Sequence, residues 1–435
     1  MRVDTVLVLG ANGTMGRNVS GIFASFGQAK VYMMCRDRQQ AESAIEKAIA
    51  SVKAESIRKR LIPCDYTQME TICGRVDLVY ESVAENFELK YEILKNVSHL
   101  VGENTTICTG TSGLSVTRLA EALRPEQRKH FLGMHMFNPP YSMPLCEIIS
   151  GKSTDPTTAQ AVAEYASVVL RRATVYVKDV AAFLANRIGF YVINDAFIQA
   201  KKHEHNGGID YIDSILGCYT GRNMPPLATA DFVGLDTHIA IVDNLYEKEE
   251  GYFKESFVVP EFLRTLVHAG KKGLKAGEGI YKSIRGPERT CQRLVYDVKE
   301  GEYRPIIQYH FPFKEEMIRL IRVGNYEQAI KVLKNNCSLE AVLCLQMLLK
   351  YILYATYCSS QISDTIHAAD VVMLAGFNWV PPIALMWAFG GPGEVIDLAE
   401  EHLGKQYVEV TRARENLMNV GPSKYDFRQC LKGRD

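Results

Sequence analysis

The chain has 435 residues, of which 47% are hydrophobic and 23% charged, and its 50 basic residues balance 50 acidic ones. This length exceeds what a single hydrophobic core usually supports, so two or three domains are expected. A net charge of zero argues against nucleic acid or an acidic membrane as the main partner. No apolar run approaches about 18 residues, so the sequence predicts no membrane-spanning segment.

The cysteines indicate the compartment. Eleven of them are scattered along the chain without a Cys-x-x-Cys pair, which argues against structural disulfides and a zinc site and favours a reducing cytoplasm. The first apolar run begins at Val6 and leads into glycines rather than a cleavage site, so it is not interpreted as a signal peptide. His203 and His205 stand beside two lysines and are interpreted as a solvated helix end, so no metal is expected.

Short apolar runs alternate with amphipathic segments in the first part of the chain. Buried strands are predicted at 6–9, 31–34, 78–80 and 106–108, and helices at 17–26, 41–54 and 87–100. The alternation continues to about Lys178. It predicts an α/β domain over residues 1–180, a Rossmann-like doubly wound parallel sheet.

The pattern becomes helical after Asp179. Helices are predicted at 183–202, 209–216, 238–246 and 260–269, and a loop rich in glycine and lysine follows at 271–281. An all-α domain is therefore expected over residues 181–285. Residues 286–313 are irregular and are interpreted as a linker with a short extended piece.

Residues 286–435 are predicted to hold this linker and a second helical domain. Its helices start near Glu315, and one long helical run covers 339–358. Two series of residues resemble each other in order: Asp213, Gly221, Pro225-Pro226 and Gly234, then Asp370, Gly376, Pro381-Pro382 and Gly390. We interpret the two regions as diverged tandem copies of one helical unit, in preference to chance similarity.

A glycine-rich loop follows the first strand directly. Glycines between a strand and a helix let the backbone approach a pyrophosphate, and the helix N-terminus supplies N–H donors. The sequence thus predicts a dinucleotide site, rather than a turn without a ligand, at Gly10, Asn12, Gly13, Thr14, Met15 and Gly16.

The end of the second strand bears on which dinucleotide binds. An acidic residue there normally holds the ribose hydroxyls of NAD, whereas an arginine can contact the 2′-phosphate of NADP. The strand ends in Cys35, which is followed by Arg36 and Asp37. Arg36 favours NADP, and Asp37 keeps NAD open.

The stretch from Gly133 to Pro140 places His135 between two apolar runs, and the second run holds Glu147. A histidine exchanges a proton near neutral pH, and a carboxylate can orient it and stabilise its cation. Oxidation of a secondary alcohol needs such a base and a hydride acceptor close by. A turn histidine is the alternative, but a carboxylate in an apolar run needs a partner.

With these motifs in order, the chain resembles the 3-hydroxyacyl-CoA dehydrogenases from Val6 to Lys282. The resemblance rests on the Gly10–Gly16 loop, Glu81 to Asn86 with Lys90, Thr111-Ser112 with Leu114, Gly133 to Pro139, Asn186-Arg187, Gly234 to Asp236, and Gly277 to Tyr281. It implies a dehydrogenase of a 3-hydroxyacyl thioester, with acyl-CoA as the substrate class and NAD or NADP as cofactor.

The resemblance also implies roles for individual residues. His135 would transfer the proton and Glu147 would orient it, while Ser112 and Asn186 would bind the substrate oxygen. Contacts with the cofactor are implied for Glu85, Lys90 and Lys275, and contacts with the CoA phosphates for Lys47 and Lys53.

Two glycines depart from the family pattern. Gly110 stands where the family usually has Asn, and Gly113 where it has Ser, so the substrate stays open. Alternatives are a carrier-protein-bound or free hydroxy acid, or a non-catalytic dinucleotide-binding scaffold. Either a monomer or a homodimer is expected, with residues beyond Glu315 packed on the first helical domain.

Overall fold

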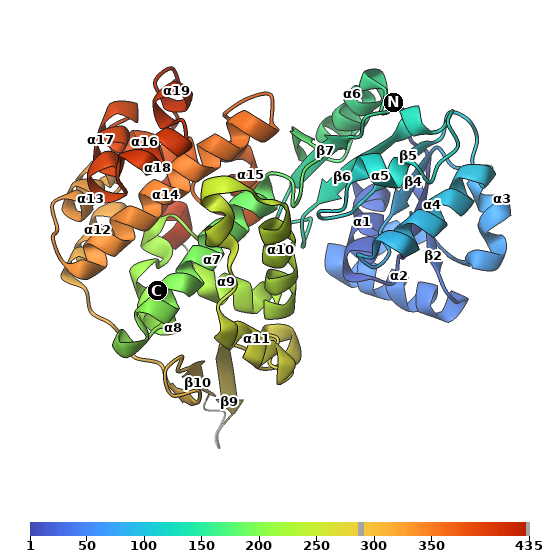
Figure 1. Cartoon of the computed structure of the whole chain (residues 1–435). Coiled ribbons are helices and arrows are strands. Elements are labelled where there is room, and N and C mark those ends of the chain that lie inside the picture. The colour runs from blue at the N-terminus through green and yellow to red at the C-terminus, as the bar shows by residue number, and fades with distance from the viewer. Residues whose placement is uncertain (286–290, 432–435) are drawn as a thin grey trace. The chain divides into compact units, whose positions relative to one another are not determined.

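The computed structural model describes residues 1–285 and 291–431. They form two compact units (Figure 1). The N-terminal unit holds Met1–Phe183 with Ile362–Asp364, and the helical unit holds Leu184–Gln361 with Thr365–Asp435.

The N-terminal unit is built on an eight-stranded sheet of order β3-β2-β1-β4-β5-β6-β7-β8. Its strands are β1 (Thr5–Leu9), β2 (Lys30–Cys35), β3 (Leu61–Asp65), β4 (Leu78–Glu81), β5 (Thr106–Thr109), β6 (Phe131–Met136), β7 (Leu145–Ser150) and β8 (Ala173–Lys178). Strands β1 to β6 run parallel, so the predicted doubly wound sheet is confirmed. Strand β7 meets β6 antiparallel and β8 parallel.

The helices of this unit are α1 (Thr14–Ser25), α2 (Arg38–Val52), α3 (Met69–Cys73), α4 (Phe87–Leu100), α5 (Val116–Ala120) and α6 (Pro156–Glu164). Side chains of α1, α2 and α6 pack against the sheet in one hydrophobic core. Four helices of this unit begin at side-chain caps, among them α2, where Asp37 accepts from the N–H of Gln40, and α4, where Asn86 accepts from that of Leu89. Helix α1 begins at Gly13 without a side-chain cap.

The helical unit contains two series of helices. The first comprises α7 (Ala185–Lys202), α8 (Ile209–Ile215), α9 (Pro226–Val233), α10 (Leu235–Lys248) and α11 (Glu261–His268). The second comprises α12 (Pro312–Arg322), α13 (Tyr326–Lys334), α14 (Leu339–Ile362), α15 (Ala368–Phe377), α16 (Pro382–Ala388), α17 (Pro392–His402), α18 (Lys405–Val410) and α19 (Ala413–Leu417).

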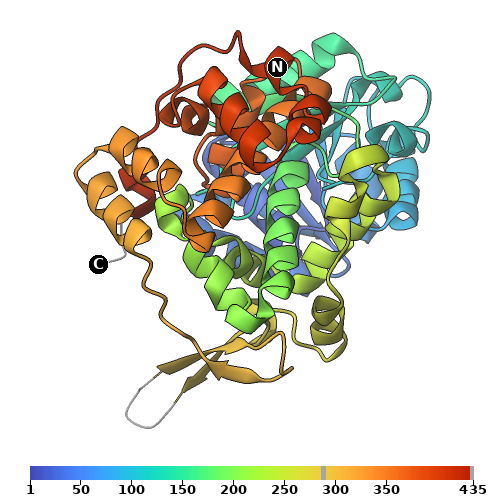
Figure 2. The same ribbon diagram turned by 60° about the vertical axis from the view of Figure 1, so that its left-hand side comes forward.

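Two strands of a small antiparallel sheet lie within the predicted linker. The prediction begins at Gly286, and residues 286–290 lie outside the described residues. Strands β9 (Tyr281–Arg285), β10 (Cys291–Tyr296) and β11 (Tyr303–Pro305) pair in the order β11-β10-β9. Figure 2 shows this sheet at one end of the helical unit, connected by an extended segment to α12.

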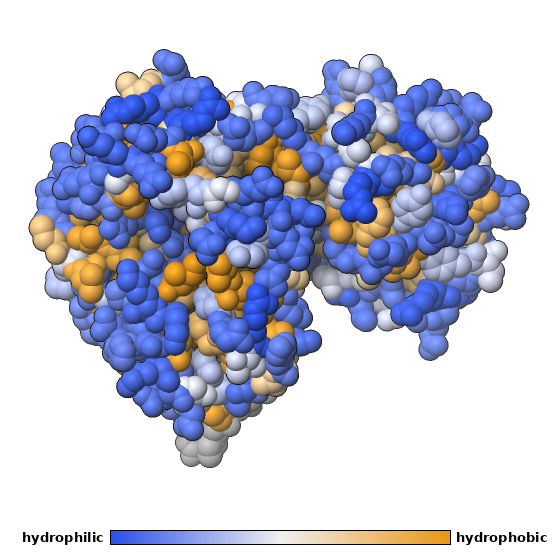
Figure 3. Space-filling model, in the orientation of Figure 1, coloured by the Kyte–Doolittle hydropathy of each residue, from blue (hydrophilic) through white to orange (hydrophobic). Residues whose placement is uncertain are grey.

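Helix α14 is long and apolar enough, by length and composition, to cross a membrane. The sequence analysis predicted the long helical run at 339–358 but no membrane-spanning segment, because polar residues interrupt the apolar runs. In the structure, 78% of its most apolar 18-residue window is buried inside the protein, as in the core helix of a globular domain. The molecular surface in view is largely hydrophilic, with scattered apolar patches (Figure 3).

The two helical series share a capping device. In the first, the carboxylate of Asp213 accepts hydrogen bonds from the backbone N–H groups of Leu227 and Ala228, each 2.9 Å long. In the second, the carboxylate of Asp370 accepts one from the N–H of Ile383 at 2.7 Å. Each aspartate thus lies on one helix and holds the first turn of the next helix, which begins at a proline pair.

One predicted correspondence is wrong. Gly221 has a φ of +91° at the end of a helical turn, but Gly376 lies inside α15. The matching left-handed residue is Asn378, with a φ of +53°, at the same spacing from Asp370 as Gly221 from Asp213. Asparagine tolerates this conformation better than most residues, so glycine was not required there.

The second helical series packs on the first, as the sequence analysis expected. The rings of Tyr191 and Tyr354 stack with centroids 3.7 Å apart. Lys350 forms an ion pair with Asp195 at 3.0 Å, and the hydroxyl of Tyr211 donates to Glu340 at 2.9 Å. Helix α7 is therefore covered by α14 from the same chain.

Candidate active site

The glycine loop lies where the strand order of the sheet reverses. Strand β1 is flanked by β2 and β4, and in doubly wound sheets such a switch point is where a ligand-binding crevice forms at the carboxyl edge. Gly10 has a φ of +72°, and a Cβ there would lie 2.6 Å from the carbonyl oxygen of Ser82. The N-terminus of α1 is free of a side-chain cap at Gly13. These features fit the pyrophosphate of a dinucleotide.

The remaining loop residues are accessible. Asn12, Gly13 and Thr14 are exposed, Met15 is half-buried and Gly16 is buried. The side-chain amide of Asn12 donates to Gln40 at 2.9 Å, which links the loop to the first turn of α2.

Arg36 and Asp37 differ in what they bind within the chain. Asp37 accepts a hydrogen bond from the N–H of Gln40 at 2.8 Å and so caps α2. Arg36 is exposed, and no residue in the described ranges pairs with its guanidinium. Of these two charged side chains at the end of β2, that of Arg36 is therefore the one left unpaired within the described residues.

His135 and Glu147 lie opposite each other across the antiparallel junction of β6 and β7. Nδ1 of the imidazole and Oε2 of the carboxylate are 2.8 Å apart, and both side chains are buried. The rings of Phe137 and Phe183 pack on the imidazole with centroids 4.6 and 5.5 Å away. With Nδ1–H donating to Glu147, Nε2 is left as the proton acceptor.

Ser112 lies in the loop after β5, at the edge of the sheet where β6 carries His135, because Thr109 of β5 pairs with Gly133 of the parallel strand β6. The backbone N–H of Ser112 donates to Oε1 of Glu85 at 2.8 Å. Its hydroxyl makes no hydrogen bond within the described residues and stays available to a ligand.

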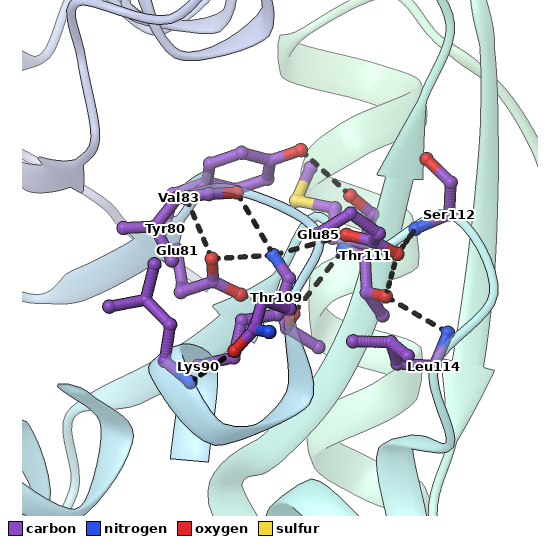
Figure 4. A network of polar contacts seen from close by, with 12 residues as sticks. Tyr80, Glu81, Val83, Glu85, Lys90, Thr109, Thr111, Ser112 and Leu114 are labelled. Atoms are coloured by element: carbon purple, nitrogen blue, oxygen red, sulfur yellow. Dashed lines mark hydrogen bonds and ion pairs between the residues drawn. The ribbon is translucent and has the colours of Figure 1, made fainter. Parts of the chain in front are cut away.

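Glu81 is a site residue whose role the sequence analysis missed (Figure 4). Its Oε1 accepts from Nζ of Lys90 at 2.7 Å, and its Oε2 accepts from the hydroxyl of Thr109 at 2.6 Å. The signal was a carboxylate at the end of an otherwise apolar strand.

Lys90 is placed differently from the expectation of a cofactor contact. Its side chain is 1% exposed, and its ammonium lies between Glu81, Glu85 and the carbonyl of Val83. In this arrangement its charge acts on the two glutamates rather than on the open crevice.

Tyr80 accounts for the departure at Gly110. A Cβ at residue 110 would lie 2.6 Å from the hydroxyl oxygen of Tyr80. That hydroxyl is buried and donates to the carbonyl oxygen of Met134 at 3.0 Å, directly before His135. The phenol thus occupies the space that a larger residue at position 110 would need.

Two predicted site residues belong to the helical unit. Asn186 is the second residue of α7 and is 6% exposed. Lys275 is exposed, pairs with Asp236, and lies 3.4 Å from the hydroxyl of Thr237.

Lys47 and Lys53, expected near the CoA phosphates, are exposed on α2 and at its C-cap. Their ammonium groups form no hydrogen bond or ion pair within residues 1–285 and 291–431. Over the same ranges, no group of three or more His, Cys, Asp or Glu residues is arranged to hold a metal ion.

Comparisons with known proteins agree with this geometry. Family models described as the NAD binding domain and the C-terminal domain of 3-hydroxyacyl-CoA dehydrogenase match residues 5–180 and 183–283. A probable 3-hydroxybutyryl-CoA dehydrogenase of Deinococcus radiodurans is 35% identical over 226 residues, covering 49% of this chain and 78% of the relative. A probable 3-hydroxyacyl-CoA dehydrogenase of Bacillus subtilis is 31% identical over 72% of this chain, which spans 38% of that relative's length.

A crystal structure gives the same assignment. The (S)-3-hydroxybutyryl-CoA dehydrogenase of Ralstonia eutropha superposes with a TM-score of 0.56 at 32% identity, covering 64% of this chain and 98% of that one. The match in fold, in both family models and in the order of the motifs leads to one assignment. The chain belongs to the 3-hydroxyacyl-CoA dehydrogenase family.

Proposed function

We propose that this chain is an NAD(P)-dependent oxidoreductase that interconverts a 3-hydroxyacyl-CoA and the corresponding 3-oxoacyl-CoA. The observation that carries the proposal is the buried pair of His135 and Glu147, 2.8 Å apart. The pair lies on β6 and β7 of the sheet that carries the glycine loop. A proton acceptor oriented by a carboxylate, in the same domain as a dinucleotide site, is what alcohol oxidation requires.

In the oxidation direction, Nε2 of His135 accepts the proton of the substrate hydroxyl. Glu147 stabilises the imidazolium that forms, because its carboxylate already accepts the Nδ1–H. The nicotinamide, when bound, accepts the hydride. In the reverse direction, His135 returns the proton to the oxygen of the 3-oxo group.

Ser112 and Asn186 are proposed to donate hydrogen bonds to the substrate oxygen, where charge develops. The free hydroxyl of Ser112 supports its role. The resemblance of Asn186-Arg187 to the family motif supports that of Asn186.

The wild-type protein should oxidise reduced nicotinamide in the presence of acetoacetyl-CoA, measured as a loss of absorbance with each cofactor. Turnover with a carrier-protein-bound or free 3-oxo acid, but not with the CoA thioester, would favour the alternative substrates. Dinucleotide binding without turnover of any of these compounds would favour a non-catalytic scaffold and reject the proposal.

We propose NADP as the preferred cofactor, with Arg36 binding its 2′-phosphate. The exposed, unpaired guanidinium supports this, as does the use of Asp37 as a helix cap. Arg36→Ala should raise the KM for NADPH by about tenfold, as expected for a lost hydrogen bond to a charged group. The KM for NADH should stay within about twofold. Equal effects on both cofactors, or none on NADPH, would reject this preference.

We also propose that residues 286–435 contain a second, diverged copy of the helical domain at 181–285, after the N-terminal domain at 1–180. The matching caps formed by Asp213 and Asp370 support this.

The protein is proposed to act in the cytoplasm. It is also proposed to be a monomer, in which the second copy covers α7.

A further inference from the structure

Among the described residues, the proposed mechanism leaves one fully buried carboxylate without a role. Glu81 ends β4 at the crevice, and its side chain is 0% exposed. A buried charge is costly unless it is paired and hydrogen-bonded. Here Glu81 accepts from Lys90 of α4, from Thr109 of β5, and from the N–H of Val83 at 2.7 Å. One side chain therefore fixes a helix, a strand and the loop after its own strand.

Lys90 connects this carboxylate to a second one. Its ammonium is 2.7 Å from Oε1 of Glu81 and 3.3 Å from Oε2 of Glu85. Unlike Glu81, Glu85 is partly open to solvent, with 44% of its side chain exposed. The ammonium therefore restrains a glutamate that borders the crevice.

Glu85 in turn holds the loop after β5. Its Oε1 accepts from the N–H of Ser112 at 2.8 Å and from the hydroxyl of Thr111. Three successive contacts therefore lead from the end of β4 to the backbone of Ser112 (Figure 4).

The carboxylate of Glu81 also influences the dinucleotide loop. The N–H of Val83 is held by Glu81, and the neighbouring carbonyl of Ser82 is the group that a Cβ on Gly10 would meet. A shift of the segment after β4 would therefore change the space beside Gly10.

We propose that Glu81 is a positioning residue, which through Lys90 and Glu85 fixes the Ser112 loop and through Val83 fixes the wall of the dinucleotide crevice. The part that concerns Ser112 rests on the proposed dehydrogenase function. A purely structural ion pair is the alternative, and apolar residues of similar size would then serve as well.

Glu81→Gln preserves the shape of the side chain but removes its charge and one acceptor. Lys90 then keeps Glu85 as its only carboxylate among the three described contacts of its ammonium. The stronger attraction draws Glu85 away from Ser112. We expect binding of the reduced dinucleotide about tenfold weaker and kcat lower by a similar factor, with the KM for acetoacetyl-CoA within about twofold.

A double-mutant cycle separates an effect that passes from Glu81 through Lys90 and Glu85, called here the relay, from a general loss of stability. Glu81→Gln is combined with Lys90→Gln, whose amide can still donate to Glu81, and separately with Glu85→Gln. Fluorescence titration with NADH and NADPH gives the affinity, and thermal unfolding gives the stability. If Glu81 acts through the relay, its substitution changes the affinity by less than about twofold in either background.

Asp77→Asn is the matched control. Asp77 precedes β4 at the opposite edge of the sheet, where its carboxylate accepts from the N–H groups of Asp4 and Thr5 at 2.9 and 2.8 Å. This variant should lower the unfolding temperature without changing dinucleotide affinity or kcat by more than about twofold.

Additive effects of Glu81→Gln in both backgrounds would overturn the relay, as would an affinity loss in Asp77→Asn equal to that in Glu81→Gln. The binding cycle does not depend on the acyl substrate. A protein that binds dinucleotide with the expected coupling, yet turns over no thioester, would reject the dehydrogenase function and retain the effect of Glu81 on the dinucleotide site through Lys90 and Glu85.

Discussion

His135→Gln should lower kcat with acetoacetyl-CoA by about three orders of magnitude while leaving dinucleotide affinity nearly unchanged, since general acid–base catalysis typically contributes a factor of roughly 10² to 10⁴. Glutamine keeps a polar group of similar length beside Glu147, but it cannot accept and return the substrate proton. The buried setting of the pair means that water is a poor replacement for the imidazole. Stopped-flow or steady-state absorbance of the reduced nicotinamide measures the loss.

His130→Gln is the matched control, because His130 precedes the same strand at its other end and faces Thr158 at 3.2 Å. Its kcat should stay within about twofold of the wild type. Glu147→Gln should cost less than His135→Gln, and the double variant should be no slower than His135→Gln alone, because residues that act as one unit are not additive. Full activity of His135→Gln would remove His135 from the mechanism.

The parts of the fold that follow from local pattern could be predicted from the sequence. Helix α4 was predicted with the bounds that the structure has, because Asn86 caps it and an apolar face continues to Leu100. The parallel strands before β6 were predicted where apolar runs are continuous. Strand β3 was missed because Pro63 interrupts its apolar pattern and Asp65 ends it.

The direction of β7 could not be predicted, because alternation along a strand carries no information about its neighbour. The facing of His135 and Glu147 depends on that direction, since the antiparallel register sets them opposite each other. The sequence placed His135 between two apolar runs and Glu147 in the second of them, and the chemistry could pair them, but only the sheet pairing shows the contact.

Contacts between segments distant in the sequence could not be predicted either. The space at Gly110 is filled by Tyr80, and the charge of Lys90 is matched by Glu81. Neither partner follows from spacing on one element, because each pair joins a strand to a different segment. For the same reason the sequence could suggest the correspondence of Asp213 and Asp370 but misplaced that of Gly221.

Residues of the second helical series cover one face of α7. Tyr191 stacks on Tyr354 and forms a hydroxyl–hydroxyl hydrogen bond with Tyr407 at 2.8 Å. Asp195 pairs with Lys350, and Phe377 lies where a Cβ on Gly189 would be. One face of a long helix is therefore apolar, aromatic and complementary to residues that follow 310.

A chain that ends at residue 310 should not persist as a soluble monomer. Its α7 would expose Tyr191 and the surface around Gly189, and each fully buried large apolar side chain is worth roughly 1.5–3 kcal/mol. We expect self-association or aggregation in size-exclusion chromatography with light scattering, and a thermal midpoint lower by about 10 °C or more. Tyr354→Ala in the full chain provides a graded test, with an expected loss of about 3–5 kcal/mol in the free energy of unfolding. A truncated chain that stays monomeric with an unchanged midpoint would show that α14 does not stabilise the first helical series, and the contacts of Tyr354 with Tyr191 would then be incidental.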